Sequence, residues 1–347
     1  MIYPTKKLGE VLEYEQPTKY LVNSTDYKDE YLTPVLTAGK SFVLGNTNEK
    51  DGIFPKEKLP VIIFDDFTTA IKFVDFPFKV KSSAMKILHA KKNIADISYL
   101  FYKMQTINFK PAQHKRYWIS EYSNLKIPLP SLKIQNQIVK RLDKIAEAQK
   151  LNEGLIQGAE DLFQSLLHKE FDPTGKDWKT KRVKDILSRE KYSVGKLKRR
   201  EYQKFGTYPI IDQSINGIAG YSENKEVVYS GKLPLVIYGD HTRIIKFVDK
   251  PFILGADGTK ILIPQDEVLA SYLYFVLHLY NVAGQGYKRH FSLLKEIKIP
   301  VPPLKIQKQI AAKLSAVQDY KTQLFAQKSK LKELFDSILA KSLRGDL

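Results

Sequence analysis

Cysteine is absent from this chain of 347 residues, which excludes a disulfide framework and a cysteine-based zinc site. Its six histidines are scattered without metal-ligand spacing, so the sequence predicts no structural metal ion. No run of about 18 apolar residues is present, although a helix needs that length to cross a bilayer. The first residues, MIYPTKKLGEVLEYEQ, also lack the apolar segment of a signal peptide. We therefore expect a soluble, cytoplasmic protein.

Motifs for catalysis are missing as well. The segment AGKS at 38–41 has Pro34 where a P-loop needs its first glycine, and GQG at 284–286 lacks the strand and helix of a dinucleotide site. No NPPY-like tetrapeptide for amino-methyl transfer is present. Asp65 and Asp66 could suggest a nuclease, but no ExK motif follows them, and an aspartate pair on a turn more often caps the turn. The sequence thus predicts no active site.

Acidic residues are few relative to basic ones. The chain has 56 Lys and Arg against 38 Asp and Glu, a formal net charge of +18. Such an excess favours a polyanionic partner, and nucleic acid is the first candidate. A merely basic soluble protein is the alternative. The lysines are spread along the chain, which argues against a single amphipathic helix on a membrane surface.

The chain is an internal duplication. Residues 58–88 and 232–262 share 16 identities in 31 aligned positions, and KIPLPSLKIQNQI at 126–138 matches KIPVPPLKIQKQI at 298–310. The two copies lie about 172–175 residues apart, so the chain has two large units and is not a solenoid of small repeats. Within the matched core the copies differ at one turn, which reads DDFTT at 65–69 and GDHTR at 239–243.

Each copy combines a β-rich part with a helix. Short apolar runs such as LPVIIF and LPLVIY, each followed by IKFVD, predict strands. The segments ISYLFYKM and ASYLYFVLHLYN predict helices that follow the strands. We expect a mixed α+β domain of about 130 residues in each copy.

A long helix follows each domain. Its apolar positions recur in alternating steps of three and four residues, which is typical of a coiled-coil seam. Pro130 and Pro302 end the preceding strands, Ser131 can cap the first helix, and FDPTG at 171–175 ends that helix. The predicted domains are residues 1–131 and 172–303, and the predicted helices are 132–171 and 304–347. The predicted seam and partner-facing residues are Ile138, Leu142, Ile145, Ile156, Phe163, Leu166, Ile310, Leu314, Val317, Leu331, Phe335 and Ile338.

The two helices can bury their apolar stripes against each other. An antiparallel pair follows if the duplicated halves are related by a pseudo-twofold axis, and the two domains would then lie at opposite ends of a rod. The alternative is that each helix packs on its own domain. The predicted fold is thus α+β, with two duplicated domains separated by two long helices that form an antiparallel coiled coil.

This layout resembles the specificity subunits (HsdS) of type I restriction-modification systems over essentially the whole chain. The resemblance is carried by YGDHTRIIKFVDKPF and FDDFTTAIKFVDFPF, by the paired IPLPSLKIQNQI and IPVPPLKIQKQI, and by LFQSLL and LFDSILAKSLRGDL. The segment before the first copy is very short, which is a departure from the family pattern.

The resemblance implies a protein that reads a split, bipartite target in double-stranded DNA, one half with each target recognition domain. It implies no catalysis and no cofactor on this chain. The expected partners are two modification (methyltransferase) subunits together with restriction subunits, and S-adenosylmethionine, ATP and Mg²⁺ are expected on those partners.

Basic and polar residues near the loops of each copy are the candidate DNA contacts, because cations neutralise phosphates and polar groups discriminate base edges. In the first copy these are Thr37, Lys40, Asn46, Asn48, Thr68, Thr69, Lys86, Lys115 and Arg116. In the second they are Asp212, Gln213, Ser214, Asn216, His241, Arg243, Lys260, Lys288, Arg289 and His290. Lys72 and Lys246, inside the shared strand, are assigned to scaffold or phosphate binding.

Two other functions stay open from the sequence. An RNA-binding or architectural protein could use the same charge without sequence specificity, and would show no fixed bipartite motif. A nuclease with a degenerate active site would cut DNA in the presence of Mg²⁺.

Overall fold

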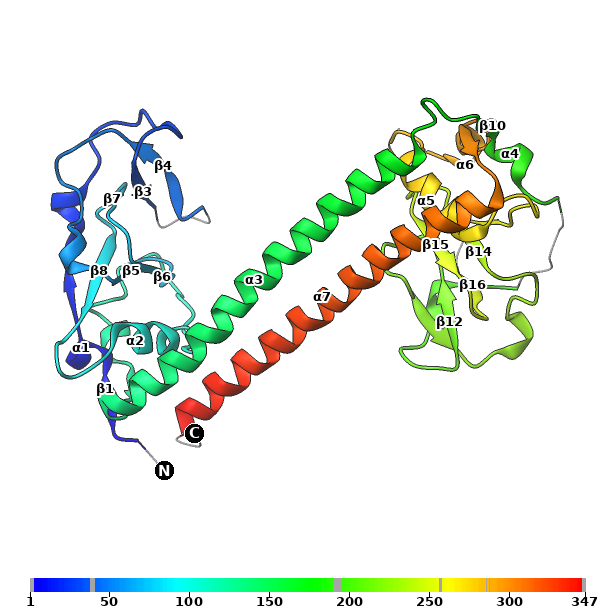
Figure 1. The fold of residues 1–347 in the computed structure, drawn as a ribbon. Coiled ribbons are helices and arrows are strands. Elements are labelled where there is room, and N and C mark those ends of the chain that lie inside the picture. Colours follow the sequence, from blue (N-terminus) through cyan, green and yellow to red (C-terminus); the bar gives the residue numbers. More distant parts are fainter. Residues whose placement is uncertain are drawn as a thin grey trace. The chain divides into compact units, whose positions relative to one another are not determined.

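The structure is a computed structural model that describes residues 3–37, 41–189, 195–255, 258–284, 286 and 288–344. The chain forms two compact units. Unit 1 comprises Met1–Asn152 with Gln327–Leu347, and unit 2 comprises Glu153–Ala326. Each unit contains one β-rich domain together with parts of both long helices (Figure 1).

Unit 1 is built on a four-stranded antiparallel sheet in the order β2-β8-β5-β6, beside a three-stranded sheet in the order β4-β3-β7. A short pair, β1 and β9, joins the beginning of the domain to its end. The elements of the domain are β1 (Thr5–Lys7), α1 (Leu8–Val11), β2 (Leu12–Glu15), β3 (Thr33–Leu36), β4 (Val43–Thr47), β5 (Val61–Asp65), β6 (Ile71–Val74), β7 (Lys79–Val80), β8 (Met85–Ala90), α2 (Ile97–Met104) and β9 (Lys126–Pro128), with short 3-10 turns at Pro17–Tyr20, Lys56–Lys58 and Tyr122–Asn124.

Unit 2 repeats this plan. Its central sheet has the order β15-β14-β17, its second sheet the order β11-β16-β12-β13, and β10 pairs with β18. The elements are β10 (Lys179–Arg182), α4 (Val183–Ile186), β11 (Lys196–Leu197), β12 (Tyr208–Ile211), β13 (Gly220–Ser222), β14 (Leu235–Gly239), β15 (Ile245–Val248), β16 (Ile253–Gly255), β17 (Thr259–Leu262), α5 (Ala270–Leu279), α6 (Phe291–Leu294) and β18 (Lys298–Val301), with 3-10 turns at Arg199–Glu201 and Lys225–Val227.

The duplication reaches further toward the amino terminus than the sequence comparison found. The strand and helical turn β1-α1 occupy the place in unit 1 that β10-α4 occupy in unit 2, and each first strand pairs antiparallel with the last strand of its domain. In sequence this is TKKLGEVL at 5–12 against TKRVKDIL at 180–187. The short segment at the start of the chain is therefore the counterpart of the start of the second copy.

The two long helices are α3 (Leu132–Phe171) and α7 (Leu304–Arg344). α3 begins two residues after Pro130 and ends just before Asp172 and Pro173, as the proline and FDPTG signals indicate. At its start, the buried side chain of Gln135 accepts from Asp96 N at 2.8 Å and donates to Pro130 O at 2.8 Å. The matched residue in the second copy, Gln307, makes the same bonds to Leu269 N and Pro302 O. The KIQ motif thus fixes where each long helix leaves its domain.

Within each unit, α3 and α7 run in opposite directions (Figure 1). In unit 2, Glu170 of α3 pairs with Lys313 of α7 at 2.8 Å, and Glu160 pairs with Lys321, so residue numbers rise along one helix as they fall along the other. In unit 1, Phe335 of α7 packs edge-on against Tyr102 of α2, with ring centroids 5.7 Å apart.

The apolar stripes also complete the domain cores, so pairing between helices and packing on the domains both occur. In unit 1, Ile138 and Leu142 lie in the core with Tyr99 and Leu100 of α2. In unit 2, the core contains Phe163, Leu167, Ile310 and Leu314 together with residues of α5 and β14.

The predicted seam is largely but not wholly buried. Among its members Ile138, Leu142, Ile145, Phe163, Ile310 and Leu314 are buried, and Ile156, Leu166, Val317, Leu331, Phe335 and Ile338 are partly buried. At the end of α3, Leu167 is buried at 1% exposed, and the predicted Leu166 beside it is partly buried and packs against the same core. The stripe there follows steps of four, from Phe163 to Leu167 to Phe171, because this end of α3 packs on the domain core as well as on α7.

Two glycines in the middle of α3 have no packing role. Apart from the adjacent residues and the backbone of α3 itself, no described atom lies within 4 Å of the position that a Cβ would take at Gly154 or Gly158. Since glycine costs a helix interior about 1 kcal/mol relative to alanine, Gly154→Ala and Gly158→Ala should each raise the free energy of unfolding by about 1 kcal/mol in urea denaturation. Gly255→Ala is the opposite control, because its Cβ would lie 2.8 Å from Ile210 Cγ2 in a buried strand and should destabilise. Stabilisation by all three variants would contradict this assignment.

Candidate nucleic-acid interface

The tip of the β5–β6 hairpin has the same backbone structure as the tip of the β14–β15 hairpin. In unit 1, Asp65 N donates to Ala70 O at 2.9 Å, and Thr69 N donates to Asp65 O at 2.9 Å. The equivalent bonds in unit 2 measure 2.9 and 2.7 Å. Thr69 and Arg243 occupy matching left-handed positions, with φ of 60° and 62°, which few residues other than glycine adopt. The two tips therefore present different side chains on one shared backbone.

A basic loop, residues 115–118 with the sequence KRYW, lies against the hairpin tip in unit 1. Asp66 Oδ1 accepts from Trp118 N at 2.7 Å, and Asp66 O accepts from Tyr117 N at 2.9 Å. Just before these anchored residues, Lys115 and Arg116 are exposed. A hydrogen bond to the Glu121 carboxylate, the largest cause, raises the pKa of Lys115. The anchor thus leaves the two cations of the loop at the surface.

Unit 2 has the same arrangement. Asp240 Oδ1 accepts from Phe291 N at 2.8 Å, and Asp240 O accepts from His290 N at 2.8 Å. A carbonyl oxygen can only accept, so the His290 ring Nδ1, 3.1 Å from the same oxygen, donates to it. Lys288 and Arg289 are exposed, as their counterparts are in unit 1.

A lysine from the neighbouring strand approaches each anchoring aspartate, but with different exposure. Lys86 Nζ lies 3.3 Å from Asp66 Oδ2, and both side chains are 1% exposed. Lys260 Nζ lies 3.8 Å from Asp240 Oδ2, and its side chain is 39% exposed. The Tyr14 ring, whose centroid is 5.3 Å from Lys86 Nζ, is one of the groups beside the first lysine.

Three of the candidate DNA contacts are buried and are corrected here. Lys86 and His290 are each 1% exposed, and Asp212 is 8% exposed, so none presents its polar group to an outside partner. Their hydrogen bonds and ion pairs go to the domain itself, and we assign them to the scaffold of the loops. Sequence alone could not separate them from Lys260, because a residue type does not report its burial.

A third loop, Asp212–Asn216, packs on the hairpin tip in unit 2. Gln213 Oε1 accepts from His241 N at 3.2 Å, and Gln213 O accepts from Thr242 Oγ1 at 2.7 Å. A Cβ on Gly239 would lie 2.9 Å from Gln213 Cβ, so glycine permits this close approach. The structure thus brings the candidates Gln213, His241 and Arg243 together with the basic loop.

The shared strand lysines differ between the units. Lys246 is buried, its Nζ donates to Asn216 O and lies 4.0 Å from Asp212 Oδ1, and burial lowers its pKa. It therefore supports the 212–216 loop. Lys72, its counterpart in unit 1, is exposed, with its Nζ 5.8 Å from the centroid of the Phe42 ring.

The remaining candidates are scattered over unit 1 and the third loop of unit 2. Thr68 is exposed and Thr69 half-buried at the hairpin tip, close to the basic loop. Asn46 lies on β4 and Asn48 just beyond it, in the second sheet, and Thr37 follows β3. Lys40 falls outside the described residues. In unit 2, Ser214 is half-buried, and its backbone N–H donates to Asp212 Oδ1 at 2.9 Å, while Asn216 is exposed.

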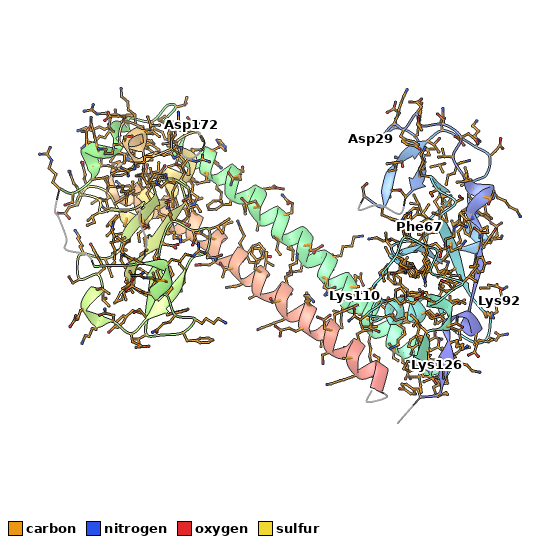
Figure 2. All side chains as sticks on the ribbon, turned by 180° about the vertical axis from the view of Figure 1, so that it is seen from behind. Asp29, Phe67, Lys92, Lys110, Lys126 and Asp172 are labelled. Atoms are coloured by element: carbon orange, nitrogen blue, oxygen red, sulfur yellow. The ribbon has the colours of Figure 1, made fainter. Side chains whose placement is uncertain are left out.

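An aromatic pair at the tip of unit 1 escaped the sequence analysis. The rings of Phe67 and His114 stack with centroids 4.5 Å apart and an interplanar angle of 8°. Phe67 is labelled among the side chains of unit 1 in Figure 2. The signal in the sequence was the position of His114 directly before Lys115 and Arg116, together with the varied position of Phe67 in the turn.

Within the described part of the chain, no group of three or more His, Cys, Asp or Glu residues is placed to hold a metal ion. Among the same residues, no helix is both long and apolar enough to span a bilayer.

Comparison with known proteins supports one family. Residues 3–161 and 175–333 each match the family model described as type I restriction modification DNA specificity domain. The chain is 55% identical over 147 residues to the specificity subunit of the Escherichia coli type I restriction enzyme EcoR124I/EcoR124II, a stretch covering 40% of this chain and 36% of that subunit. It is 26% identical over 288 residues to the MjaVIII specificity subunit of Methanocaldococcus jannaschii, covering 69% of this chain and 68% of that one.

Solved structures show the same fold. The S subunit of a type I restriction-modification system from M. genitalium superposes with a TM-score of 0.72 at 16% identity, covering 98% of this chain and 96% of that one. A chain from a structure concerning complex assembly and conformational transition of the type I R-M system gives a TM-score of 0.51 at 19% identity, covering 100% of this chain and 98% of that one.

Proposed function

Because this chain belongs to the HsdS family of type I restriction-modification specificity subunits, we propose that each of its two units reads one half of a split target in double-stranded DNA. The observation that carries this proposal is the duplicated interface. Both units hold a hairpin tip and a basic loop with the same backbone bonds, while half-buried side chains at the tips differ, with Phe67 and Thr69 in unit 1 against His241 and Arg243 in unit 2. A shared scaffold with different polar groups suits two half-sequences of different bases.

The charges of each interface suit the two parts of DNA recognition. Lys115 and Arg116 in unit 1, and Lys288 and Arg289 in unit 2, can neutralise phosphates and set the register. The polar groups at the tips, among them Thr68 in unit 1 and His241 in unit 2, are then left to discriminate base edges.

The long helices are proposed to dock the modification subunits, of which we expect two, with restriction subunits joining the complex. Both helices carry large apolar side chains that neither unit covers: Leu151, Leu155, Leu162, Phe325 and Leu334, between 47% and 65% exposed. Such residues are typical of a face that a partner helix covers. S-adenosylmethionine, ATP and Mg²⁺ would bind to those partner subunits, and this chain would catalyse no step. The complex would work in the cytoplasm.

The test begins with the methylated motif in the genome of cells that carry this chain and its modification subunits. We expect two short fixed sequences separated by unspecified bases. The full chain should bind a duplex with that motif, and the logarithm of its binding constant should fall against the logarithm of salt concentration with a slope of about −0.9 for each phosphate neutralised. A flat response between about 50 and 200 mM salt, or binding of all duplexes alike, would support a basic or architectural protein instead.

Arg289→Ala tests the assignment of half-sites to units. Arg289 is exposed in the basic loop of unit 2, and a bidentate contact of arginine to guanine is worth about 1–3 kcal/mol. We expect Arg289→Ala to lose binding free energy of that size at the second half-site. Discrimination between bases in the first half-site should be unchanged. Arg243→Ala should act on the same half-site, although Arg243 Nη1 also donates to Val282 O at 3.0 Å and braces its own loop. Equal losses at both half-sites would show that the assignment is wrong.

A further inference from the structure

The anchoring aspartates Asp66 and Asp240 cannot themselves touch DNA. They are 1% and 3% exposed, and a carboxylate facing the phosphates would be repelled by them. Any part they take in recognition must therefore be indirect, through the groups that they hold.

Each aspartate joins three segments that are distant in sequence. In unit 2, Asp240 N donates to Gly258 O at 2.7 Å, its own carbonyl accepts from His290 N, and its carboxylate accepts from Phe291 N. In unit 1, Asp66 makes the same three kinds of bond, to Ala84 at 3.1 Å and to Tyr117 and Trp118. The backbone carbonyl and the side-chain carboxylate of one aspartate thus both bind the basic loop to the hairpin tip.

The aspartate is also retained at a turn where its neighbours change. Within the turn, positions 65, 67 and 69 differ from 239, 241 and 243, whereas Asp66 and Asp240 are the same residue. The Lys-Arg pair of the basic loop is likewise the same in both copies, at 115–116 and 288–289. The turn thus keeps the anchoring aspartate and the threonine at 68 and 242, the basic loop keeps its cations, and the side chains that change include Phe67 against His241 and Thr69 against Arg243.

We propose that Asp66 and Asp240 are positioning residues for DNA reading: each fixes the Lys-Arg pair of its basic loop relative to the hairpin tip, so that both loops meet the DNA as one rigid element. This inference rests on the proposed function. The physical reason is that ordering a loop on binding costs free energy, and a loop that is already anchored in the free protein avoids that cost.

The decisive variants are in unit 2, where the lysine beside the anchor is partly exposed and a change is tolerated more readily. Asp240→Ala removes the acceptor for Phe291 N, whereas Asp240→Asn keeps an acceptor oxygen in the same place. Asp249→Ala is the matched control, because Asp249 is an exposed aspartate just after β15 in the same unit. If the alanine variant does not fold, Asp240→Glu replaces it, since it keeps the charge but moves the acceptor by one methylene group.

The first measurement is limited trypsin digestion of the full chain without DNA. A released loop should be cut after Lys288 and Arg289 at least about tenfold faster in Asp240→Ala, because cleavage follows the population of the open loop. The Asn variant and the Asp249→Ala control should be cut like the parent chain. Equal cleavage of all four proteins would overturn the proposal.

The second measurement is binding to the duplex that carries the methylated motif. Asp240→Ala should lower the salt slope by about 1 to 2, the loss of one or two phosphate contacts, and should weaken discrimination in the second half-site only. Asp66→Ala should do the same for the first half-site. A uniform loss of binding with an unchanged salt slope would mean that the aspartates merely stabilise the fold.

The two measurements separate failure of this inference from failure of the proposed function. Faster digestion of Asp240→Ala in a protein that shows no bipartite specificity would leave the anchor in place but refute its use in reading DNA. Unchanged digestion in a protein that does read two half-sites would refute the anchor alone.

Discussion

Leu314→Asp is expected to lower the free energy of unfolding by at least about 4 kcal/mol. Leu314 is fully buried, in the core that α7 shares with Phe163 and Leu167 of α3. Removing a buried leucine costs about 2–5 kcal/mol, and an unpaired carboxylate in its place adds a further penalty of several kcal/mol. Because domains are stable by only about 5–15 kcal/mol, this loss removes a large part of the stability of unit 2.

Urea denaturation followed by circular dichroism measures this change, with Leu334→Asp as the matched control on the same helix. Leu334 is 47% exposed, so the aspartate there stays in water and should change the stability by less than about 1 kcal/mol. Phe335→Asp should fall between the two, because Phe335 is only partly buried at the edge of the unit 1 core. An unchanged urea midpoint for Leu314→Asp would show that α7 does not pack in that core.

Lengthening both helices by one heptad is expected to lengthen the unspecified spacer of the methylated motif by about 3 bp. One heptad enters between Asn152 and Ile156 and another between Leu324 and Lys328, close to the positions where each helix passes from one unit into the other. Seven residues keep the stripe of apolar positions in phase. At 1.5 Å per residue they add about 10.5 Å, and base pairs are about 3.4 Å apart. The added twist of the DNA must be taken up by bending or flexing.

The half-sequences themselves should not change, because both interfaces lie outside the inserted segments. The measurement is the methylated motif in cells that carry the lengthened chain with its modification subunits. Insertion of a heptad into α3 alone is the control, and it should reduce methylation because the two helices no longer match in length. An unchanged spacer with altered half-sequences would refute the idea that the helices set the distance.

The beginnings and ends of the long helices are set by local signals, which is why the sequence predicts them well. Proline cannot continue a helix and glycine favours its termination, whatever surrounds them. The same holds for the antiparallel strands on either side of each variable turn, where the apolar run before the turn and the IKFVD segment after it pair as expected.

The details of the interface depend on residues that are distant in sequence. In the sequence, Asp66 and Asp240 are one of two unchanged positions of a varied turn, and their partners Trp118 and Phe291 lie about 50 residues further along. The ring stack of Phe67 on His114 likewise joins two residues that are far apart in the sequence. No local pattern reports such contacts, because they exist only once the loops have been brought together by the sheets.

The sequence by itself determined that the chain is duplicated, that each half is an α+β domain followed by a long helix, and that the family resemblance covers both halves, because these follow from identity, periodicity and helix-ending residues. Only the tertiary structure decided which polar residues face outward. Lys86 and Lys260 occupy the same place in the repeat, yet one is 1% and the other 39% exposed. The Tyr14 ring lies beside Lys86, whereas the alignment of TKKLGEVL with TKRVKDIL places Arg189 at the position of Tyr14 in the second copy. Burial depends on the neighbours that folding brings around a residue, and the position of that residue in the sequence does not show which neighbours these are.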